Sequence, residues 1–118
     1  MPGYLAAQDA LKAKGIDEVL VYCVNDGAVM QAWAKDQGVA GSMITFLADT
    51  RGELTAALDL VMDHPGPLHV LGTKRTKRYA AYAEDGVVKV CHVSEGPGDP
   101  AGDEDPSASC VAAMLAAI

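Results

Sequence analysis

The spacing of apolar residues differs between the first two segments of the chain. Between Tyr4 and Lys14 the apolar residues fall at near-helical spacing, and Gly15 ends the run. The next stretch, Val19–Val24, is apolar on both faces, which is typical of a strand inside a sheet covered by helices on both sides. The pattern therefore predicts an amphipathic helix followed by a buried inner strand.

The alternation of strand and helix continues through the middle of the chain. Asn25 and Asp26 are expected to cap a helix over "GAVMQAWAKDQG". The stretch "SMITFLAD" predicts a second buried strand, and Thr50 is expected to cap a helix over "TRGELTAALDL". Six apolar side chains are expected on the buried faces of these two helices: Val29, Met30, Trp33, Leu54, Ala57 and Leu58. Because helices connect the two strands, we expect the strands to run parallel.

The second half of the chain follows a different pattern. The stretch "MDHPGPLHVLGT" contains two prolines and predicts irregular structure, whereas Asp85-Gly86 between two alternating runs predicts a hairpin over residues 78–93. The stretch "SEGPGDPAGDEDPSAS" predicts a mobile surface loop, and a helix is expected over Ser109–Ala117. This order predicts one α/β domain over residues 1–118, the later part of a thioredoxin-like fold. No strand precedes its first helix, so we expect the domain to be truncated at its N-terminus.

Composition narrows the functional classes. The chain has 118 residues and a formal net charge of −7, which argues against nonspecific binding to nucleic acid or to anionic membrane surfaces. Its apolar runs are too short to span a bilayer. Cys23, Cys91 and Cys110 lie far apart without a CxxC motif, which argues against a disulfide framework or a zinc ribbon and favours a reducing compartment. The pattern does not distinguish the cytoplasm from a mitochondrion or chloroplast.

Several motifs, in order, resemble the atypical peroxiredoxins of the type-II and type-five class. They are "PGY", "LKAKG", "VND" followed by "VMQAWAK", "FLAD", "GTKRTKRY" and "AEDGVVK". The resemblance covers nearly the whole chain and implies a thioredoxin-like fold. In that family the residues before "PGY" carry the peroxidatic cysteine and its activating threonine. The resemblance therefore implies that this chain begins downstream of the nucleophile.

The resemblance also implies a role for Arg78. It matches the family's active-site arginine, whose guanidinium would lower a thiol pKa and donate hydrogen bonds to developing negative charge. From the pattern alone, Arg78 belongs to a solvated basic run with Lys74, Arg75 and Lys77. Both interpretations remain open at this stage.

The three cysteines are expected to differ in environment. Cys23 and Cys91 fall within predicted strands and are expected to be buried, inert thiols. Cys110 lies near the start of the last helix, where the helix dipole lowers a thiol pKa, and it is the one candidate for a redox thiol. Without a peroxidatic partner, however, it has no sulfenic acid to resolve.

The histidines and the acidic stretch near the C-terminus give no sign of a metal site or of a catalytic pair. His64 and His69 lack metal-ligand spacing, and His92 should point away from Cys91 because neighbours in a strand face opposite sides. We expect no metal and no cofactor. One acid-rich stretch, residues 95–105 and here called the acidic loop, reads as a solvated loop or as a docking surface for a basic partner; its acids are Glu95, Asp99, Asp103, Glu104 and Asp105.

Two functions remain open from the sequence. One is a non-catalytic, peroxiredoxin-like subunit of a larger assembly, in which another chain covers the edge of the Val19–Val24 strand. The other is a fragment of a thiol peroxidase that, when complete, would reduce hydrogen peroxide and alkyl hydroperoxides; the resemblance implies glutaredoxin or glutathione as its electron donor. In either case the chain alone is expected to be weakly stable, because stability is only about 5–15 kcal/mol and a central strand contributes much of it.

Overall fold

The computed structural model describes residues 1–118 and contains both helices and strands, as the sequence predicts. The helices are α1 Pro2–Ala6, α2 Gln8–Ala13, α3 Gly27–Gln37, α4 Glu53–Ala57, α5 Pro65–Leu71, the 3-10 turn η1 Ser107–Ser109 and α6 Val111–Ala117. The strands are β1 Val19–Cys23, β2 Ile44–Ala48, β3 Val61–Met62, β4 Arg75–Thr76, β5 Tyr79–Glu84 and β6 Val87–Val93. None of the helices is long and apolar enough to cross a membrane.

The predicted strand pairings are confirmed. β1 and β2 run parallel, with Val19 opposite Ile44 and Cys23 opposite Ala48. β5 and β6 form the expected antiparallel hairpin. Asp85 and Gly86 at its turn have φ of 51° and 78°, the positive values that a tight two-residue hairpin turn requires.

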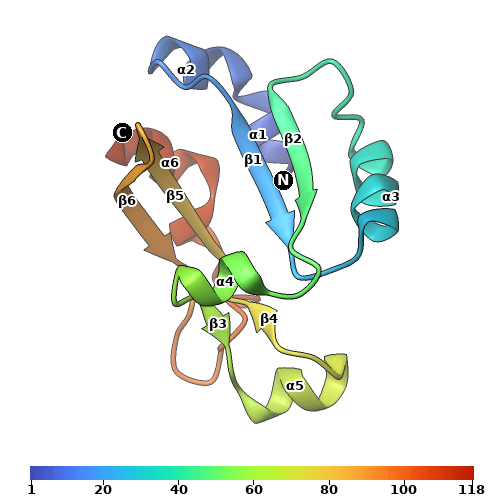
Figure 1. The fold of residues 1–118 in the computed structure, drawn as a ribbon. Helices are drawn as coiled ribbons and strands as arrows, with labels where there is room; N and C mark the ends of the chain where they lie inside the picture. The colour runs from blue at the N-terminus through green and yellow to red at the C-terminus, as the bar shows by residue number, and fades with distance from the viewer.

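The strands form three separate two-stranded sheets rather than one continuous sheet. Figure 1 shows β1 and β2 on one side of the molecule and the β5–β6 hairpin on the other, and no backbone pairing joins β1 to β5. The Val19 amide donates to Met43 O of the β2 side at 3.0 Å. Because successive backbone groups point to opposite sides of a strand, the amides of Leu20 and Tyr22 lie on the edge of β1 away from β2. We call this break in backbone pairing between β1 and β5 the β1–β5 gap.

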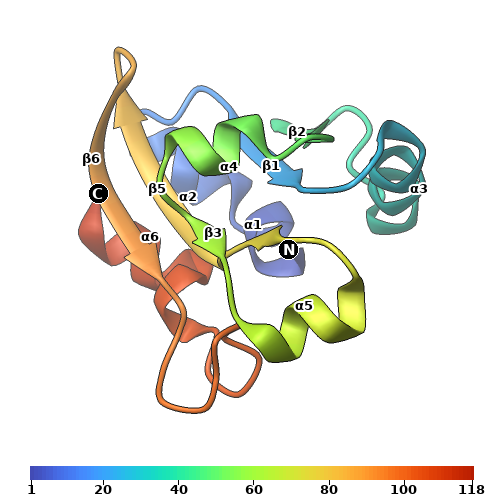
Figure 2. The ribbon, with the colours of Figure 1, turned by 60° about the horizontal axis from the view of Figure 1, so that its bottom comes forward.

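Helices cover these strands unevenly. Trp33 of α3 packs edge-on against Phe46 of β2, with ring centroids 4.7 Å apart, so α3 covers one face of the β1–β2 pair. The N-terminal helices pack against the C-terminal segment, where the Tyr4 hydroxyl donates to Ser109 O at 2.7 Å. Figure 1 and Figure 2 both show α5 at the periphery of the molecule. Only 10 of the 118 residues are buried, so the core is small.

Several local predictions are wrong. The stretch over α5 is helical rather than irregular, because Pro65 occupies its first turn, where a proline is tolerated, and the His64 Nδ1 accepts from Gly66 N. The N-terminal helix is split into α1 and α2 around Ala7. Asp49 rather than Thr50 satisfies the amides at the start of α4.

The predicted buried faces also need correction. Val29 of α3 is exposed, and so are Leu54 and Ala57 of α4 and its C-cap Leu58. In α4 the side chain turned toward the protein is instead that of Thr55, whose exposed fraction is 1%. Leu20 in β1 is 58% exposed, so this strand is not covered on both faces as its sequence predicts. The other edge of β1 has no strand partner within residues 1–118, since β1 pairs only with β2.

Candidate functional site

Arg78 lies immediately before β5, at an exposed position. Its Nε donates to Ala101 O at 3.1 Å, and its Nη2 lies 2.7 Å from Asp103 Oδ1. The guanidinium is thus engaged by the acidic loop. The next residue in sequence, Tyr79, reaches the other side of the β1–β5 gap, because its hydroxyl donates to the Tyr22 hydroxyl at 2.9 Å. Arg78 therefore lies where the hairpin approaches β1.

The acidic loop is folded around one of its own carboxylates. Asp99 is 9% exposed and accepts from the amides of Asp103, Glu104 and Asp105 at 2.9, 3.1 and 3.4 Å. The sequence predicted only a mobile loop, because the composition of a loop does not reveal such local hydrogen bonds. One carboxylate in the middle of the loop thus fixes the position of the segment that reaches Arg78.

None of the three thiols hydrogen-bonds to Arg78, and all three cysteines are free. Burial raises the pKa of the Cys23 thiol, with Arg75 opposing the shift. Cys91 is exposed rather than buried as predicted, because it lies on the face of the hairpin opposite to His92, which is the side chain that packs inward against Ala108 O. Residues 91 and 92 therefore do point to opposite faces.

Cys110 is exposed and lies at the N-cap of α6. Its Sγ lies 3.4 Å from Pro106 O, to which it donates. Burial raises the pKa of the nearby Tyr4 to about 12, and the proximity of Cys110 adds to the increase. Cys110 thus has the accessibility that a redox thiol needs, but its Sγ hydrogen-bonds to Pro106 O and not to Arg78.

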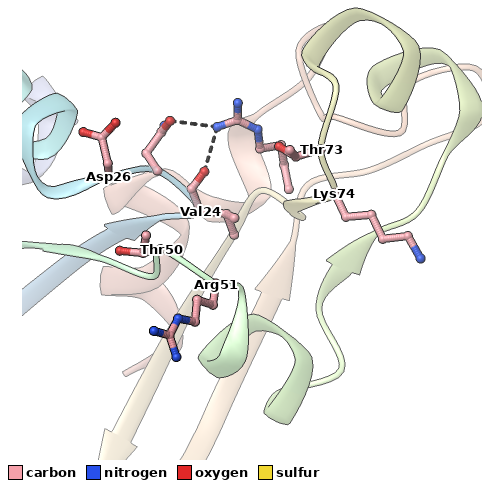
Figure 3. A pocket seen from close by; sticks show the side chains of 8 residues that line it. Val24, Asp26, Thr50, Arg51, Thr73 and Lys74 are labelled. Carbon is pink, nitrogen blue, oxygen red and sulfur yellow. Dashed lines mark hydrogen bonds between the residues drawn. The ribbon is translucent and has the colours of Figure 1, made fainter.

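A polar cavity lies at the carboxyl ends of β1 and β2 (Figure 3). Its volume is about 450 Å³, and its lining includes Thr50, Arg51, Thr73, Lys74 and Arg75. The Arg75 Nη1 donates to Val24 O at 2.7 Å and to Asn25 Oδ1 at 2.9 Å, the two bonds drawn as dashed lines.

The basic side chains around this cavity already have acidic or carbonyl partners. Lys74 extends away from Val24 in Figure 3 and pairs with Asp63 at 3.2 Å. Arg51 pairs with Glu53 at 3.7 Å. Arg75 ties the end of β1 to β4, and its buried Nε has no hydrogen-bond partner. The sequence prediction treated Arg75 only as part of a basic run, since nothing in the local sequence reveals its contact with residues some 50 positions away.

Hydroxyl groups connect β1, α4, β4 and β5 beside the gap. Tyr22 is the centre of this cluster: its hydroxyl lies 2.9 Å from that of Tyr79, 3.4 Å from Thr76 Oγ1 and 3.5 Å from Thr55 Oγ1. Burial, together with the hydrogen bond to Tyr22, raises the pKa of Tyr79. Sequence reasoning missed this cluster, because each hydroxyl stands in a different element.

Asp49 extends the cluster to the start of α4. Its carboxylate accepts from Thr55 Oγ1 at 2.7 Å, from Thr55 N at 2.9 Å and from Leu54 N at 3.3 Å. Desolvation alone would raise the pKa of Asp49, but the hydrogen bonds from Thr55 and Leu54 together outweigh it and lower that pKa. No group of three or more His, Cys, Asp or Glu side chains is arranged to hold a metal ion.

Comparison with known proteins gives one consistent result. Residues 1–109 match the Redoxin family. The chain is 41% identical over 96 residues to the chloroplastic peroxiredoxin-2E-2 of rice, which covers 81% of this chain and 42% of the relative. It is 46% identical over 92 residues to the peroxisomal membrane associated protein 20 of Schizosaccharomyces pombe, covering 76% of this chain and 57% of that protein.

Solved structures agree with the sequence relatives. Reduced Prx3 from Vibrio vulnificus in complex with hydrogen peroxide is 38% identical and superposes with a TM-score of 0.81, over 99% of this chain and 68% of that one. The chain spans only 42% and 57% of the lengths of the two sequence relatives above. These matches confirm the predicted thioredoxin-like α/β fold. The chain therefore belongs to the redoxin family, and within that family to the peroxiredoxins.

Proposed function

We propose that residues 1–118 form a peroxiredoxin-like module that is not itself a peroxidase and acts as a structural or interaction subunit of a larger assembly. The observation that carries this proposal is the β1–β5 gap. β1 pairs only with β2, so its second edge has no strand partner within residues 1–118. An exposed strand edge is a template for pairing with another segment. The module is therefore suited to receive a strand or helix from a partner.

The β1–β2 pair exposes two large apolar side chains. Leu20 in β1 is 58% exposed and Leu47 in β2 is 44% exposed. Burying apolar area is worth about 25 cal/mol per Å², so a partner that covers this edge near Val19–Val24 would gain stability from these side chains. Strand addition would also pair the backbone groups of Leu20 and Tyr22. Three free thiols suit a reducing compartment for this assembly.

The chemistry at Arg78 supports the non-catalytic half of the proposal. Peroxide reduction needs an accessible thiolate within reach of a group that stabilises developing charge. The Arg78 guanidinium instead engages Asp103 and Ala101 O, and the only exposed thiol near the C-terminal segment, Cys110, is hydrogen-bonded to Pro106 O. We therefore expect no thiol-dependent peroxidase turnover from residues 1–118 alone.

A second candidate function is thiol peroxidase activity with a cysteine supplied by a further segment. The place of Arg78 in the sequence favours it, because the next residue, Tyr79, reaches β1 through its hydrogen bond to Tyr22. The electron donor would then be glutathione or glutaredoxin. A redox role for Cys110 would arise only under this second candidate function.

Peroxide consumption distinguishes these possibilities. Wild-type chain, Cys110→Ser and Arg78→Ala are assayed with dithiothreitol, or with glutathione and glutaredoxin. The proposed function predicts background rates for all three. Turnover that both substitutions abolish would identify Cys110 as a nucleophile and overturn the proposal. Turnover that appears only after addition of a cysteine-bearing segment would favour the second candidate.

A further inference from the structure

The polar cavity at the carboxyl ends of β1 and β2 is lined by three segments that lie far apart in the sequence (Figure 3). These segments are residues 24–26 after β1, residues 50–51 after β2 and residues 73–75 at the start of β4. In open α/β sheets, ligands bind at the carboxyl ends of the parallel strands. With a volume of about 450 Å³, the cavity has room for a small molecule.

The lining of this cavity is basic, although the chain as a whole is acidic. The chain has 9 Lys and Arg residues against 16 Asp and Glu residues. Around the cavity the ratio is reversed, because one acid, Asp26, stands against three bases, which are Arg51, Lys74 and Arg75. The Asp26 carboxylate already accepts from Val29 N at the start of α3. The cavity therefore favours an anion over a cation.

Arg75 is the base that the fold holds in place. Its hydrogen bonds to Val24 O and to Asn25 Oδ1 are both donated by Nη1. Nε and Nη2 form the other edge of the planar guanidinium, and Nε is buried without a hydrogen-bond partner. This edge is the one that binds two oxygens of a single phosphate or carboxylate through parallel hydrogen bonds. Arg75 is thus fixed through one nitrogen, while its second edge lacks the acceptor that an oxyanion supplies.

The other two bases are free to turn toward such a ligand. Arg51 pairs with Glu53 at 3.7 Å and Lys74 pairs with Asp63 at 3.2 Å, and all four side chains are more than half exposed. Solvent screens pairs of this kind, so they contribute little net free energy. A bound anion can therefore replace either carboxylate as the partner of Arg51 or Lys74.

We propose that this cavity binds a small phosphate-bearing anion, with the Arg75 guanidinium as its main donor. Three bases match the double charge of phosphate better than the single charge of a carboxylate, and Thr50 and Thr73 add hydroxyl groups to the lining. A second cavity of about 210 Å³ shares four lining residues with the first, Arg75 among them, and adds Ala56 and Val61. It has room for a short, partly apolar body. The ligand is therefore free phosphate or the phosphate monoester of a small molecule.

NMR titration with sodium phosphate and with glycerol 3-phosphate tests the proposal, because amide shifts report which segments meet the anion. Sodium chloride at the same ionic strength controls for screening. The variants are Arg75→Lys, Arg51→Gln and Lys89→Gln. Lys89 is exposed in β6 and lines neither cavity, so Lys89→Gln removes the same charge elsewhere. If circular dichroism shows that Arg75→Lys loses its fold, Arg51→Gln still decides the test, since Arg51 forms only an exposed pair with Glu53.

Phosphate should produce saturable shifts at residues 24–26, 50–51 and 73–75. Arg75→Lys should weaken binding about tenfold, because an ammonium group cannot form two parallel hydrogen bonds. Arg51→Gln should weaken it about threefold, as expected for an exposed charge contact, and Lys89→Gln should bind like wild type. Tighter binding of glycerol 3-phosphate than of phosphate would identify a monoester as the ligand, and an affinity no higher would identify free phosphate. No saturable shift with either probe, or an equal loss in Arg51→Gln and Lys89→Gln, would overturn the inference and leave the proposed function untouched.

Discussion

Replacing Asp49 by alanine tests the packing that positions α4 beside the gap. The substitution removes the acceptor for three donors, Leu54 N, Thr55 N and Thr55 Oγ1. Thr55 is 1% exposed, so water cannot take the place of the carboxylate at that hydroxyl. The hydroxyl retains only the Tyr22 oxygen at 3.5 Å, which is the limit of a hydrogen bond.

The expected loss of unfolding free energy in Asp49→Ala is the sum of two effects. Removing a side-chain cap costs about 1 kcal/mol. Leaving the buried hydroxyl poorly paired costs about 1 kcal/mol more. For a domain of this size the entropy of unfolding is roughly 0.25 kcal/mol/K, so a destabilisation of about 2 kcal/mol lowers Tm by about 8 °C. Asp26→Ala is a matched control, because Asp26 accepts only from Val29 N at an exposed site and should cost about half as much.

The pH dependence gives an independent check. The pKa of Asp49 is lowered on folding from its ordinary value of 3.8, so its stabilisation is present above that value and is lost as pH falls through the folded pKa. Urea unfolding followed by circular dichroism should give a constant difference between wild type and Asp49→Ala from pH 5 to 8. The difference should shrink below pH 4. An equal effect of Asp26→Ala, or a difference that grows at low pH, would refute this reasoning.

Three further outcomes are expected from the same structure. Tyr22→Phe removes the hydroxyl that Tyr79 uses and should lower the free energy of unfolding by about 1 kcal/mol in urea titration; no change would mean that the hydroxyl cluster does not stabilise the fold. Iodoacetamide should alkylate Cys110 faster than Cys23 at pH 7.5, because burial raises the pKa of Cys23, and the reverse order would contradict the assigned environments. Gly102→Ala should cost about 2 kcal/mol or more in the same titration, and a wild-type midpoint would show that the loop adopts another conformation.

The sequence predicted the parts of the fold that depend on local pattern. The apolar run of β1, the turn at Asp85-Gly86 and the cap at Asp26 each follow from residues close together in the chain, and each is confirmed. The α5 helix was missed because its two prolines lie in the first turn, where they permit a helix rather than break it.

The contacts of the candidate site depended on distant residues. Arg78 was identified from its family resemblance, but its pairing with Asp103, 25 positions away, follows only from the folded loop. Burial of Cys91 was predicted from its strand, yet the strand exposes that face. The sequence pattern shows which residues of a strand share a face. Only the packed structure shows which of the two faces is covered by other elements.

Hydrogen exchange at the backbone of β1 tests the central claim most directly. The Val19 amide donates to Met43 O just before β2, whereas the amides of Leu20 and Tyr22 lie on the unpaired edge of β1, so one strand contains its own control. In protein isolated under native conditions with its partners retained, we expect Leu20 and Tyr22 to be as protected as Val19. Protection of Val19 with rapid exchange at Leu20 and Tyr22, in a stably folded monomer at micromolar concentration, would contradict the account.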